Sequence, residues 1–206
     1  QELKAVAVSG RLIYMRDGED VADARNRFGN GMRQGQLFWP HLCQCLNSAV
    51  FTGDQKTPMT HAVILTKKSL LQQFPFDANY VRGNGYREES DFQMNLYVHG
   101  YDIYTTNDCC TLHLPMSQVV GGGQRVGVWQ RVYWSIVYTK YFFDKYYADY
   151  ARRAELKAPQ WVSLAVFCIF AVYKELFRPL LCSLYLFLTS SMRPRGGDGV
   201  QTPTRK

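Results

Sequence analysis

The clearest hydrophobic periodicity in the chain follows a Gly-Asn-Gly turn at residues 83–85. Phe92, Leu96 and His99 recur at spacings of four and three residues, which places them on one face of a helix. The pattern stops at Gly100, and glycine commonly follows the last turn of a helix. We therefore expect a helix from about Glu88 to His99.

Several shorter apolar runs in the first half of the chain predict strands. Residues 4–12 form one such run and residues 60–66 form a second. Residues 101–106 alternate between apolar and polar positions, which predicts a third strand. An Asn-Asp pair at residues 107–108 then predicts a turn, after which residues 109–114 continue in extended form.

The segments between these strands follow other patterns. Residues 16–36 are rich in Gly, Asp, Arg and Asn and have almost no apolar periodicity, so we expect a long surface loop. Apolar positions in residues 37–51 have roughly helical spacing, and residues 67–73 predict a short helix before a turn at Pro75. This mixture of strands and helices predicts an α/β protein.

The second half of the chain becomes helical and aromatic. Residues 128–153 have a helical pattern with many tyrosines, and a long helix packed on the core is the simplest interpretation. The same density of tyrosines and cations also suits a helix close to a membrane interface.

Pro159 begins an almost wholly apolar segment that charged residues interrupt before Arg178 and Pro179. Neither half reaches the roughly 20 residues that span a bilayer. We expect one helix, a break at Arg178 and Pro179, and a second helix, either embedded in one leaflet or packed as a hairpin. A single kinked span is the alternative. Residues 159–191 are therefore predicted to associate with a membrane.

The charge of the chain limits the classes of partner that it is expected to bind. The formal net charge is +7, with a pI of about 9.1, and part of the excess lies in residues 192–206, which predict a disordered basic tail. Such basicity suits an anionic membrane surface or a phosphorylated substrate as well as nucleic acid. No nucleic-acid-binding module is recognisable, so we expect no nucleic-acid partner.

The six cysteines do not have the spacing of a zinc site. We expect free thiols, mostly buried, in a reducing compartment. Their even number leaves disulfides as the alternative.

Glu88, Glu89 and Asp91 place three carboxylates in the first turn of the expected helix. One interpretation is structural, because acidic side chains near a helix N-terminus interact favourably with the helix dipole. The other is catalytic, because like charges held close together raise one another's pKa, as a general base requires.

These acids belong to a stretch that resembles a known family. Residues 85–92 read Gly-Tyr-Arg-Glu-Glu-Ser-Asp-Phe and are followed by Leu96, Gly-Tyr at 100–101 and His-Leu at 113–114. This order is similar to the second half of the catalytic domain of family 2 glycosyltransferases. In that family a Tyr-Arg-Glu-Glu-Thr-Asp-Phe run opens a helix over the acceptor site, and Ser90 here stands in place of the Thr.

The resemblance extends over roughly residues 1–145 and is strongest from 58 to 114. Thr60-His61-Ala62 is similar to the family's Thr-Gly-Ala segment, and Phe76-Asp77 to its Gly-Phe-Asp-Glu turn. His61 and Pro75 are departures, because the family has Gly at both positions.

The resemblance implies an α/β fold, namely the C-terminal half of a GT-A-like (Rossmann-like, mixed-sheet) glycosyltransferase domain followed by amphipathic and hydrophobic helices. We expect the acceptor-side part of this domain at residues 1–127 and an aromatic-rich helix at residues 128–158. The hydrophobic segment 159–191 and the tail 192–206 complete the chain.

The family pattern implies roles for individual residues. Asp91 would be the base that takes the proton of the acceptor hydroxyl, with Glu88 or Glu89 as its neighbour and Glu89 as the second candidate for the base. The remaining implied residues are Tyr86, Arg87, His61 and Arg125 for substrate binding and His113 for a divalent metal, Mg²⁺ or Mn²⁺. For Arg87, orienting the acid cluster is the alternative to binding the acceptor. For His61, His113 and Arg125, a purely structural role is the alternative.

The family's Asp-x-Asp motif, which holds the metal and the sugar nucleotide, has no counterpart in the sequence. We therefore expect the chain to be part of a larger protein. The implied reaction transfers a hexosyl-type sugar from a nucleotide-sugar donor to a hydroxyl of a glycan, lipid or protein acceptor. We expect a membrane-associated enzyme with its catalytic part in the cytoplasm. The alternative is a non-catalytic membrane-associated module or an inactive remnant of such an enzyme.

Overall fold

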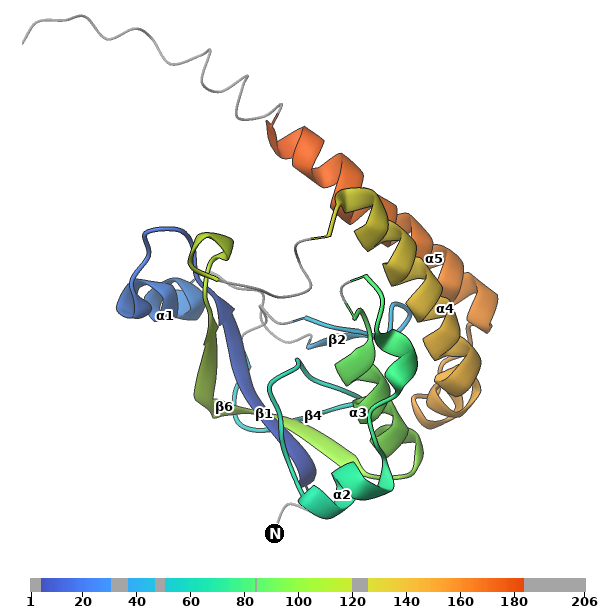
Figure 1. Ribbon diagram of the computed structural model, residues 1–206. Helices are drawn as coiled ribbons and strands as arrows, with labels where there is room; N and C mark the ends of the chain where they lie inside the picture. Colours follow the sequence, from blue (N-terminus) through green and yellow to red (C-terminus); the bar gives the residue numbers. More distant parts are fainter. Residues whose placement is uncertain (1–4, 31–36, 47–50, 84, 120–125, 184–206) are drawn as a thin grey trace, which may run out of the picture.

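A four-stranded mixed sheet lies at the centre of the computed structural model (Figure 1). The structure describes residues 5–30, 37–46, 51–83, 85–119 and 126–183. Helices cover one side of the sheet, and the fold is mixed α/β, as the sequence predicts.

The sheet is built around two long strands, β1 (Ala5–Tyr14) and β6 (Asp102–His113), which pair in parallel. The short strand β4 (Gln55–Thr57) adds antiparallel to β6, and β5 (Leu65–Thr66) adds antiparallel to β1. The strand order is therefore β4-β6-β1-β5. Only the last two residues of the strand predicted at 60–66 join the sheet.

A bulge replaces the turn predicted at residues 107–108. Ser9 pairs with Thr105 whereas Arg11 pairs with Cys110, so β6 has several more residues than β1 between these two pairs. Such extra residues bend a strand and leave it continuous. Gly10 permits the close approach at this point, because a Cβ there would lie 2.7 Å from the Cys109 carbonyl oxygen.

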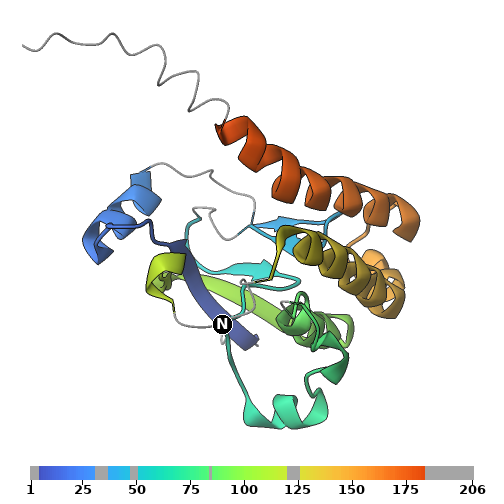
Figure 2. The same cartoon turned by 45° about the horizontal axis from the view of Figure 1, so that its top comes forward.

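Three helices form the layer beside the sheet. Helix α3 (Glu88–Val98) lies between the sheet and α4 (Val128–Arg153), and α5 (Gln160–Val172) packs along α4 (Figures 1 and 2). α3 and α4 begin where the sequence predicts, and so does the short helix α2 (Lys68–Gln73) to within one residue. The main core contains fully buried side chains from α3, β6 and α4, among them Phe92, Met94, Leu96, Ile103, Phe142 and Phe143.

Part of the segment expected to be a long loop is helical. Residues 21–30 form α1 (Val21–Asn30), and residues 31–36 lie outside the described residues. The backbone N–H of Asp23 donates to the Asp20 side chain at 2.8 Å, which satisfies one of the free donors of the first turn. Among the side chains described for this helix, at residues 21–27, Ala24 alone is fully buried. Its sequence has no apolar periodicity that would predict a helix.

The helix expected within residues 37–51 is a hairpin instead. β2 (Phe38–Trp39) pairs antiparallel with β3 (Gln44–Cys45), and residues 47–50 lie outside the described residues. Pro40 begins the turn between them, and its carbonyl accepts the N–H of Cys43, whose φ is +47°. Proline at the start of a tight turn is compatible with this geometry.

The helical break predicted at Arg178 and Pro179 is wrong. α5 continues through a π-helical turn, η4 (Tyr173–Phe177), into a further α-helical stretch at residues 178–183. A proline lacks the N–H that would bond the carbonyl four residues earlier, here that of Glu175. That carbonyl lies in the wider π turn, and such turns accommodate local irregularity within a helix. Among the described residues, no helix is long and apolar enough to cross a membrane.

All six cysteines are free, as expected, but they are not mostly buried. Cys43 alone is fully enclosed, and Cys109 and Cys182 are exposed. The expectation that most cysteines are buried is therefore wrong.

Candidate functional site

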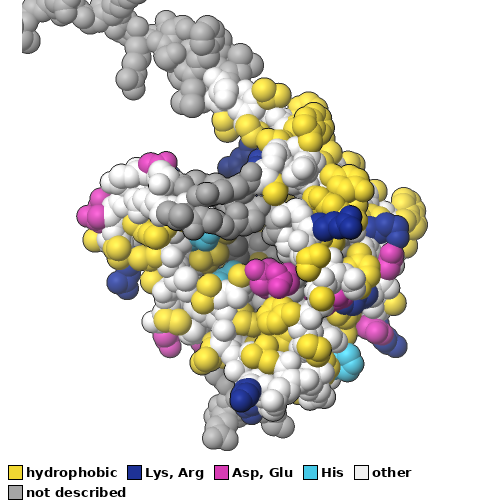
Figure 3. All heavy atoms as spheres, in the orientation of Figure 1, with side chains coloured by type: hydrophobic (Ala, Val, Ile, Leu, Met, Phe, Trp, Pro, Cys, Tyr) yellow, Lys and Arg dark blue, Asp and Glu magenta, His cyan; other side chains and the backbone are white. Residues whose placement is uncertain are grey.

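A polar pocket of about 400 Å³ opens between the start of α3, the ends of β1 and β6, and the segment at residues 59–63. Figure 3 shows a hollow in this face, with histidine side chains inside it and acidic side chains at its rim. The polar side chains that line the pocket include Tyr14, Gln44, His61, Glu89, Ser90 and His113. The pocket thus combines residues from both ends of the stretch that resembles glycosyltransferases.

The backbone before α3 takes an unusual path into the pocket. Gly83, Gly85 and Arg87 have φ values of +64°, +62° and +80°, so three residues before the helix lie in the left-handed region. Glycine adopts this region freely, but a residue with a long side chain does so only where its surroundings hold it. The contacts of Arg87 therefore have to stabilise this turn.

Arg87 is a buried structural clamp, 4% exposed. Its guanidinium donates to the Cys43 carbonyl, to the Leu42 carbonyl at 2.9 Å and to the Thr139 hydroxyl at 3.2 Å. The guanidinium also lies 4.9 Å from the centre of the Phe142 ring. Because all three of its nitrogens are engaged, Arg87 fixes the start of α3 against the β2–β3 turn and α4. Of its two predicted roles, orienting the acids fits this position, whereas binding the acceptor does not.

Asp91 points away from the pocket into a buried hydrogen-bond network. It is 1% exposed and accepts hydrogen bonds from Tyr80 (2.8 Å), Lys145 (2.6 Å) and Tyr146 (3.0 Å). Asp91 is not among the residues that line the pocket. Its carboxylate is therefore held by structural partners from α4 and from the short 3₁₀ helix η1 (Ala78–Tyr80).

Asp77 completes this network at the surface. Its carboxylate accepts hydrogen bonds from Lys145 at 2.7 Å and from Tyr141 at 2.9 Å. Burial raises the pKa of Asp77, but the hydrogen bonds from Lys145, the Asn79 backbone and Tyr141 outweigh burial and hold the pKa at about 2. Lys145 thus bridges two carboxylates, whose hydrogen bonds raise its pKa although burial opposes them.

Glu89 has the opposite surroundings. It is exposed at the rim of the pocket beside Ser90. Within the described residues its carboxylate forms no hydrogen bond or ion pair, so it is open to a ligand. Glu88 is also exposed but does not line the pocket. The three acids therefore separate into one at the pocket, one at the surface outside it and one in the interior.

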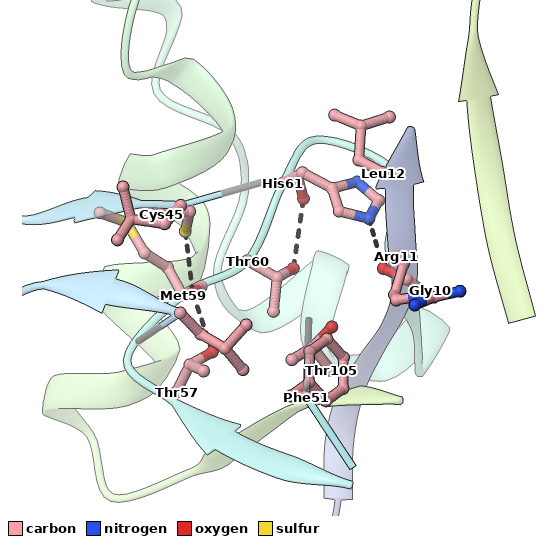
Figure 4. A pocket seen from close by; sticks show the side chains of 12 residues that line it. Gly10, Arg11, Leu12, Cys45, Phe51, Thr57, Met59, Thr60, His61 and Thr105 are labelled. Carbon is pink, nitrogen blue, oxygen red and sulfur yellow. Dashed lines mark hydrogen bonds between the residues drawn. The ribbon is translucent and has the colours of Figure 1, made fainter. Parts of the chain in front are cut away.

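His61 has both ring nitrogens engaged, and Figure 4 shows the contact of one of them with Gly10. Nε2 lies 2.7 Å from the Gly10 carbonyl oxygen, and Nδ1 lies 3.1 Å from the Val63 backbone nitrogen. A carbonyl only accepts and a backbone N–H only donates, so the ring is neutral with its proton on Nε2. Burial lowers the pKa of His61, although the Gly10 carbonyl opposes this. His61 thus fastens the 59–63 segment to β1, which fits the structural alternative.

His113 keeps one nitrogen available. Its Nδ1 lies 2.9 Å from the Leu114 carbonyl oxygen, which requires Nδ1 to donate. Nε2 then presents a lone pair, and in the described part of the chain it has no hydrogen-bond partner. The ring packs against Tyr14, with 4.9 Å between the ring centres. Metal-binding histidines commonly have the same arrangement: one ring nitrogen donates to a backbone carbonyl, and the other is free to bind the metal.

The described residues do not form a complete metal site by themselves. They contain no group of three or more His, Cys, Asp or Glu side chains that could hold an ion. One imidazole does not hold Mg²⁺ or Mn²⁺, which prefer several oxygen ligands. The expected metal role of His113 would therefore need further ligands from the substrate or from residues outside the described set.

Two glutamines shape the pocket, and the sequence gave no reason to select them. Gln93 on α3 is fully buried; its Oε1 accepts the Thr60 N–H at 2.6 Å and its Nε2 donates to the His61 carbonyl at 3.2 Å. Gln44 lines the pocket, and its buried Oε1 has no partner within the described residues. A polar residue at an inward position of a predicted helix is the signal that could have identified Gln93.

A second cavity of about 30 Å³ adjoins the pocket behind His61 (Figure 4). Thr57, Thr60 and Thr105 contribute hydroxyl groups to its wall. Its volume suits about one water molecule. This small cavity is thus too small for a substrate.

Tyr86 and Arg125 are the remaining predicted substrate residues. Tyr86 is half-buried at the pocket, where burial raises its pKa, and its ring centre lies 6.1 Å from that of Phe167 on α5. Arg125 lies outside the described residues. Tyr86 therefore joins the pocket to α5, and the role of Arg125 stays a prediction.

Comparisons with protein-family models, with curated proteins and with solved structures found no match to this chain. The fold that the structure defines is mixed α/β with a mixed four-stranded sheet.

Proposed function

We propose that the chain is the acceptor-side part of a GT-A-like glycosyltransferase, with the pocket at the start of α3 as its acceptor site. The support is the sequence resemblance at residues 85–92 together with the position of that stretch, which opens a helix at the rim of a polar pocket. Pockets with a few converging polar groups are the usual sites of small-molecule chemistry.

The observation that carries the proposal is the open carboxylate of Glu89 in a pocket that also holds the open nitrogen of His113. A general base has to reach the substrate, and Asp91 is enclosed by Tyr80, Lys145 and Tyr146. Glu89, the second candidate from the sequence, therefore takes the role of the base in our proposal.

The proposed step moves one proton and exchanges one bond. Glu89 accepts the proton of the acceptor hydroxyl while the hydroxyl oxygen forms a bond to the anomeric carbon of the donor sugar. The bond between that carbon and the diphosphate oxygen breaks, and its electron pair leaves with the nucleoside diphosphate. Ser90 and Gln44 line the same pocket and supply hydrogen-bonding groups for the acceptor.

A divalent cation would stabilise the leaving diphosphate if the donor or another part of the protein completed its ligands. His113 is the residue of this chain that would contact it. The assignment of Glu89 as base does not rely on this cation.

The experiment compares two adjacent glutamates. The protein is incubated with nucleotide-sugars, Mn²⁺ and a glycan acceptor, and release of nucleoside diphosphate is measured for wild type, Glu89→Gln and Glu88→Gln. Loss of a general base lowers the rate by about 10²- to 10⁴-fold, which we expect for Glu89→Gln alone. Glu88→Gln is the matched control, because Glu88 is exposed on the same turn but does not line the pocket.

Equal rates for the two variants would remove Glu89 from the mechanism. If wild type neither released a nucleoside diphosphate nor bound a nucleotide or a glycan acceptor by calorimetry, the transferase proposal would fail. The non-catalytic membrane-associated module would then be the better description of this chain.

A further inference from the structure

The outward face of α5 and its continuation is a long exposed apolar surface. Trp161 and Ile169 are each 71% exposed, and large apolar side chains continue at intervals that fit one helical face. We call this surface the apolar stripe; its members are Trp161, Ile169, Tyr173, Phe177, Leu180 and Leu181. In Figure 3 hydrophobic side chains gather along this edge of the molecule. Contiguous apolar surfaces of this kind mark interaction sites.

The inner face of the same helix is packed against the rest of the protein. Phe167 is 1% exposed and Ala171 5%, and the Phe170 ring packs edge-on against Trp39 at 5.5 Å. Beyond Ala171 none of the described residues of this helix is buried, and the helix runs out past the start of α4 (Figures 1 and 2). Packing within the described chain thus accounts for one face and leaves the stripe exposed.

Charges beside the stripe favour an anionic partner. Lys174 and Arg178 lie on the same helical stretch, and both are exposed. The nearby acid, Glu175, pairs with Arg131 of α4 at 3.0 Å and more loosely with Lys174 at 3.8 Å; its side chain is 22% exposed, against 45% for Lys174. The positive charges of Lys174 and Arg178 therefore remain at the surface, whereas ion pairing neutralises the charge of Glu175.

We propose that the apolar stripe docks on the surface of an anionic lipid bilayer, with the helix lying in the plane of the interface. Trp and Tyr are the aromatic residues that prefer the headgroup level, and Trp161 and Tyr173 both belong to the stripe. Lys174 and Arg178 would meet the lipid phosphates. Charged residues in mid-helix fit this position better than a crossing of the bilayer.

The docked helix would also bring the pocket to the bilayer. Phe167, on the inner face of α5, contacts Tyr86, and the Arg87 guanidinium lies 5.3 Å from the centre of the Phe167 ring. The stripe and the pocket are thus linked through one packed helix. Docking itself does not depend on the proposed transferase activity, because it rests on the outer face alone.

The test is flotation of the full chain with vesicles of phosphatidylcholine, with and without phosphatidylglycerol. Wild type should float with the anionic vesicles. Ile169→Glu and Phe177→Glu should each weaken binding by about tenfold or more, because each removes a buried apolar side chain from the bound state. Leu65→Glu is the matched control: Leu65 is 78% exposed but lies on β5, so its variant should float like wild type.

A second set of variants tests the charge. Lys174→Ala and Arg178→Ala should each weaken binding to anionic vesicles by about fivefold, which corresponds to the value of one cation near such a surface. Added salt should reduce wild-type binding in the same direction. Circular dichroism of every variant establishes that its helices are intact.

Several results would overturn the proposal. These are an absence of flotation, equal binding to neutral and anionic vesicles, and binding that the two stripe variants leave unchanged. Sedimentation adds a further one: a dimer of wild type that Ile169→Glu dissociates, without vesicle binding, would assign the stripe to a second copy of the chain. A blue shift of tryptophan fluorescence on adding anionic vesicles, lost in Trp161→Phe, would place the stripe in the interface.

Discussion

Two carboxylates on the first turn of α3 have opposite surroundings. Glu89 and Asp91 are two residues apart, and at 3.6 residues per turn this separation places them about 200° apart around the helix. Asp91 meets α4 and is enclosed by three donors, whereas Glu89 faces the pocket. One acidic run thus supplies a structural anchor and an exposed acid.

The two histidines of the pocket repeat this contrast. His61 uses both nitrogens to hold backbone groups, and His113 uses one and leaves the other open. In both pairs the group that is fully bonded stabilises the fold, and the group with an open atom can take part in chemistry. The predictions below test this division.

The largest effect is expected at Asp91. Asp91→Asn removes the charge that Lys145 faces and disturbs the hydrogen bonds of Tyr80 and Tyr146. The buried hydroxyls of Tyr80 and Tyr146 then lose a charged acceptor, and Lys145 keeps only Asp77, so the free energy of unfolding should fall by about 3 kcal/mol. Urea denaturation monitored by circular dichroism measures this change.

The control for Asp91 is a surface pair on α4. Asp144 pairs with Lys140, and both side chains are largely exposed, so Asp144→Asn should cost about 0.5 kcal/mol or less. If Asp91→Asn were as mild as this control, the carboxylate would not be the anchor that its contacts indicate.

Arg87→Lys should have the next largest effect. A lysine cannot serve the carbonyls of Leu42 and Cys43 and the Thr139 hydroxyl together, because it lacks the planar fork of a guanidinium. We expect the free energy of unfolding to fall by about 2 kcal/mol, since buried acceptors lose their donors. Arg82→Lys, at an exposed position that touches the Trp134 ring, is the comparison and should be nearly neutral in the same urea titration. Equal stability of the two variants would contradict the stabilising role of the Arg87 hydrogen bonds.

The sequence predicts the long helices well because each has many residues to establish a period. α3 and α4 begin where their patterns begin. β2 and β3 have two residues each and are held by a turn at Pro40 and by contacts with α4 and α5, so no local pattern predicts them. Likewise, the described side chains of α1 include one buried alanine, and Asp20 caps the helix, so neither gives a periodic pattern.

The site is predictable only in part for the same reason. The motif selects a small region of the molecule, and five of the predicted site residues line one pocket: His61, Tyr86, Arg87, Glu89 and His113. Which acid faces the pocket depends on Lys145 and Tyr146, which are more than fifty residues away in the sequence. Gln93 gains its role from backbone groups that only the fold brings near, and Gln44 gains its role from the pocket that the fold forms around it.

Substitutions of the two pocket histidines should lower the free energy of unfolding by smaller and unequal amounts. His61→Ala loses two hydrogen bonds to backbone groups in a buried segment, so we expect a loss of about 1.5 kcal/mol in the free energy of unfolding. His113→Ala loses one bond to its neighbour and should cost about 0.5 kcal/mol. Long-range ¹H–¹⁵N spectra of the wild type should show His61 as the neutral Nε2–H form. A loss at His113 that exceeds the loss at His61 would reverse the assignment of structural and open histidine.

An effect comparable to the difference between the two histidine variants is expected for the acid sensitivity of the surface end of the Asp91 network. The pKa of Asp77 is about 2 in the folded protein and 3.8 ordinarily, so its ionised form is favoured by folding. Its contribution is complete above pH 4 and is lost as the pH falls toward about 2, because the unfolded chain takes up the proton first. After allowance for solvent screening, we expect about 1 kcal/mol from this carboxylate. Urea titrations of wild type and Asp77→Asn should therefore differ near neutral pH and converge in acid, whereas a constant difference would show that the hydrogen bonds of Asp77 act without its charge.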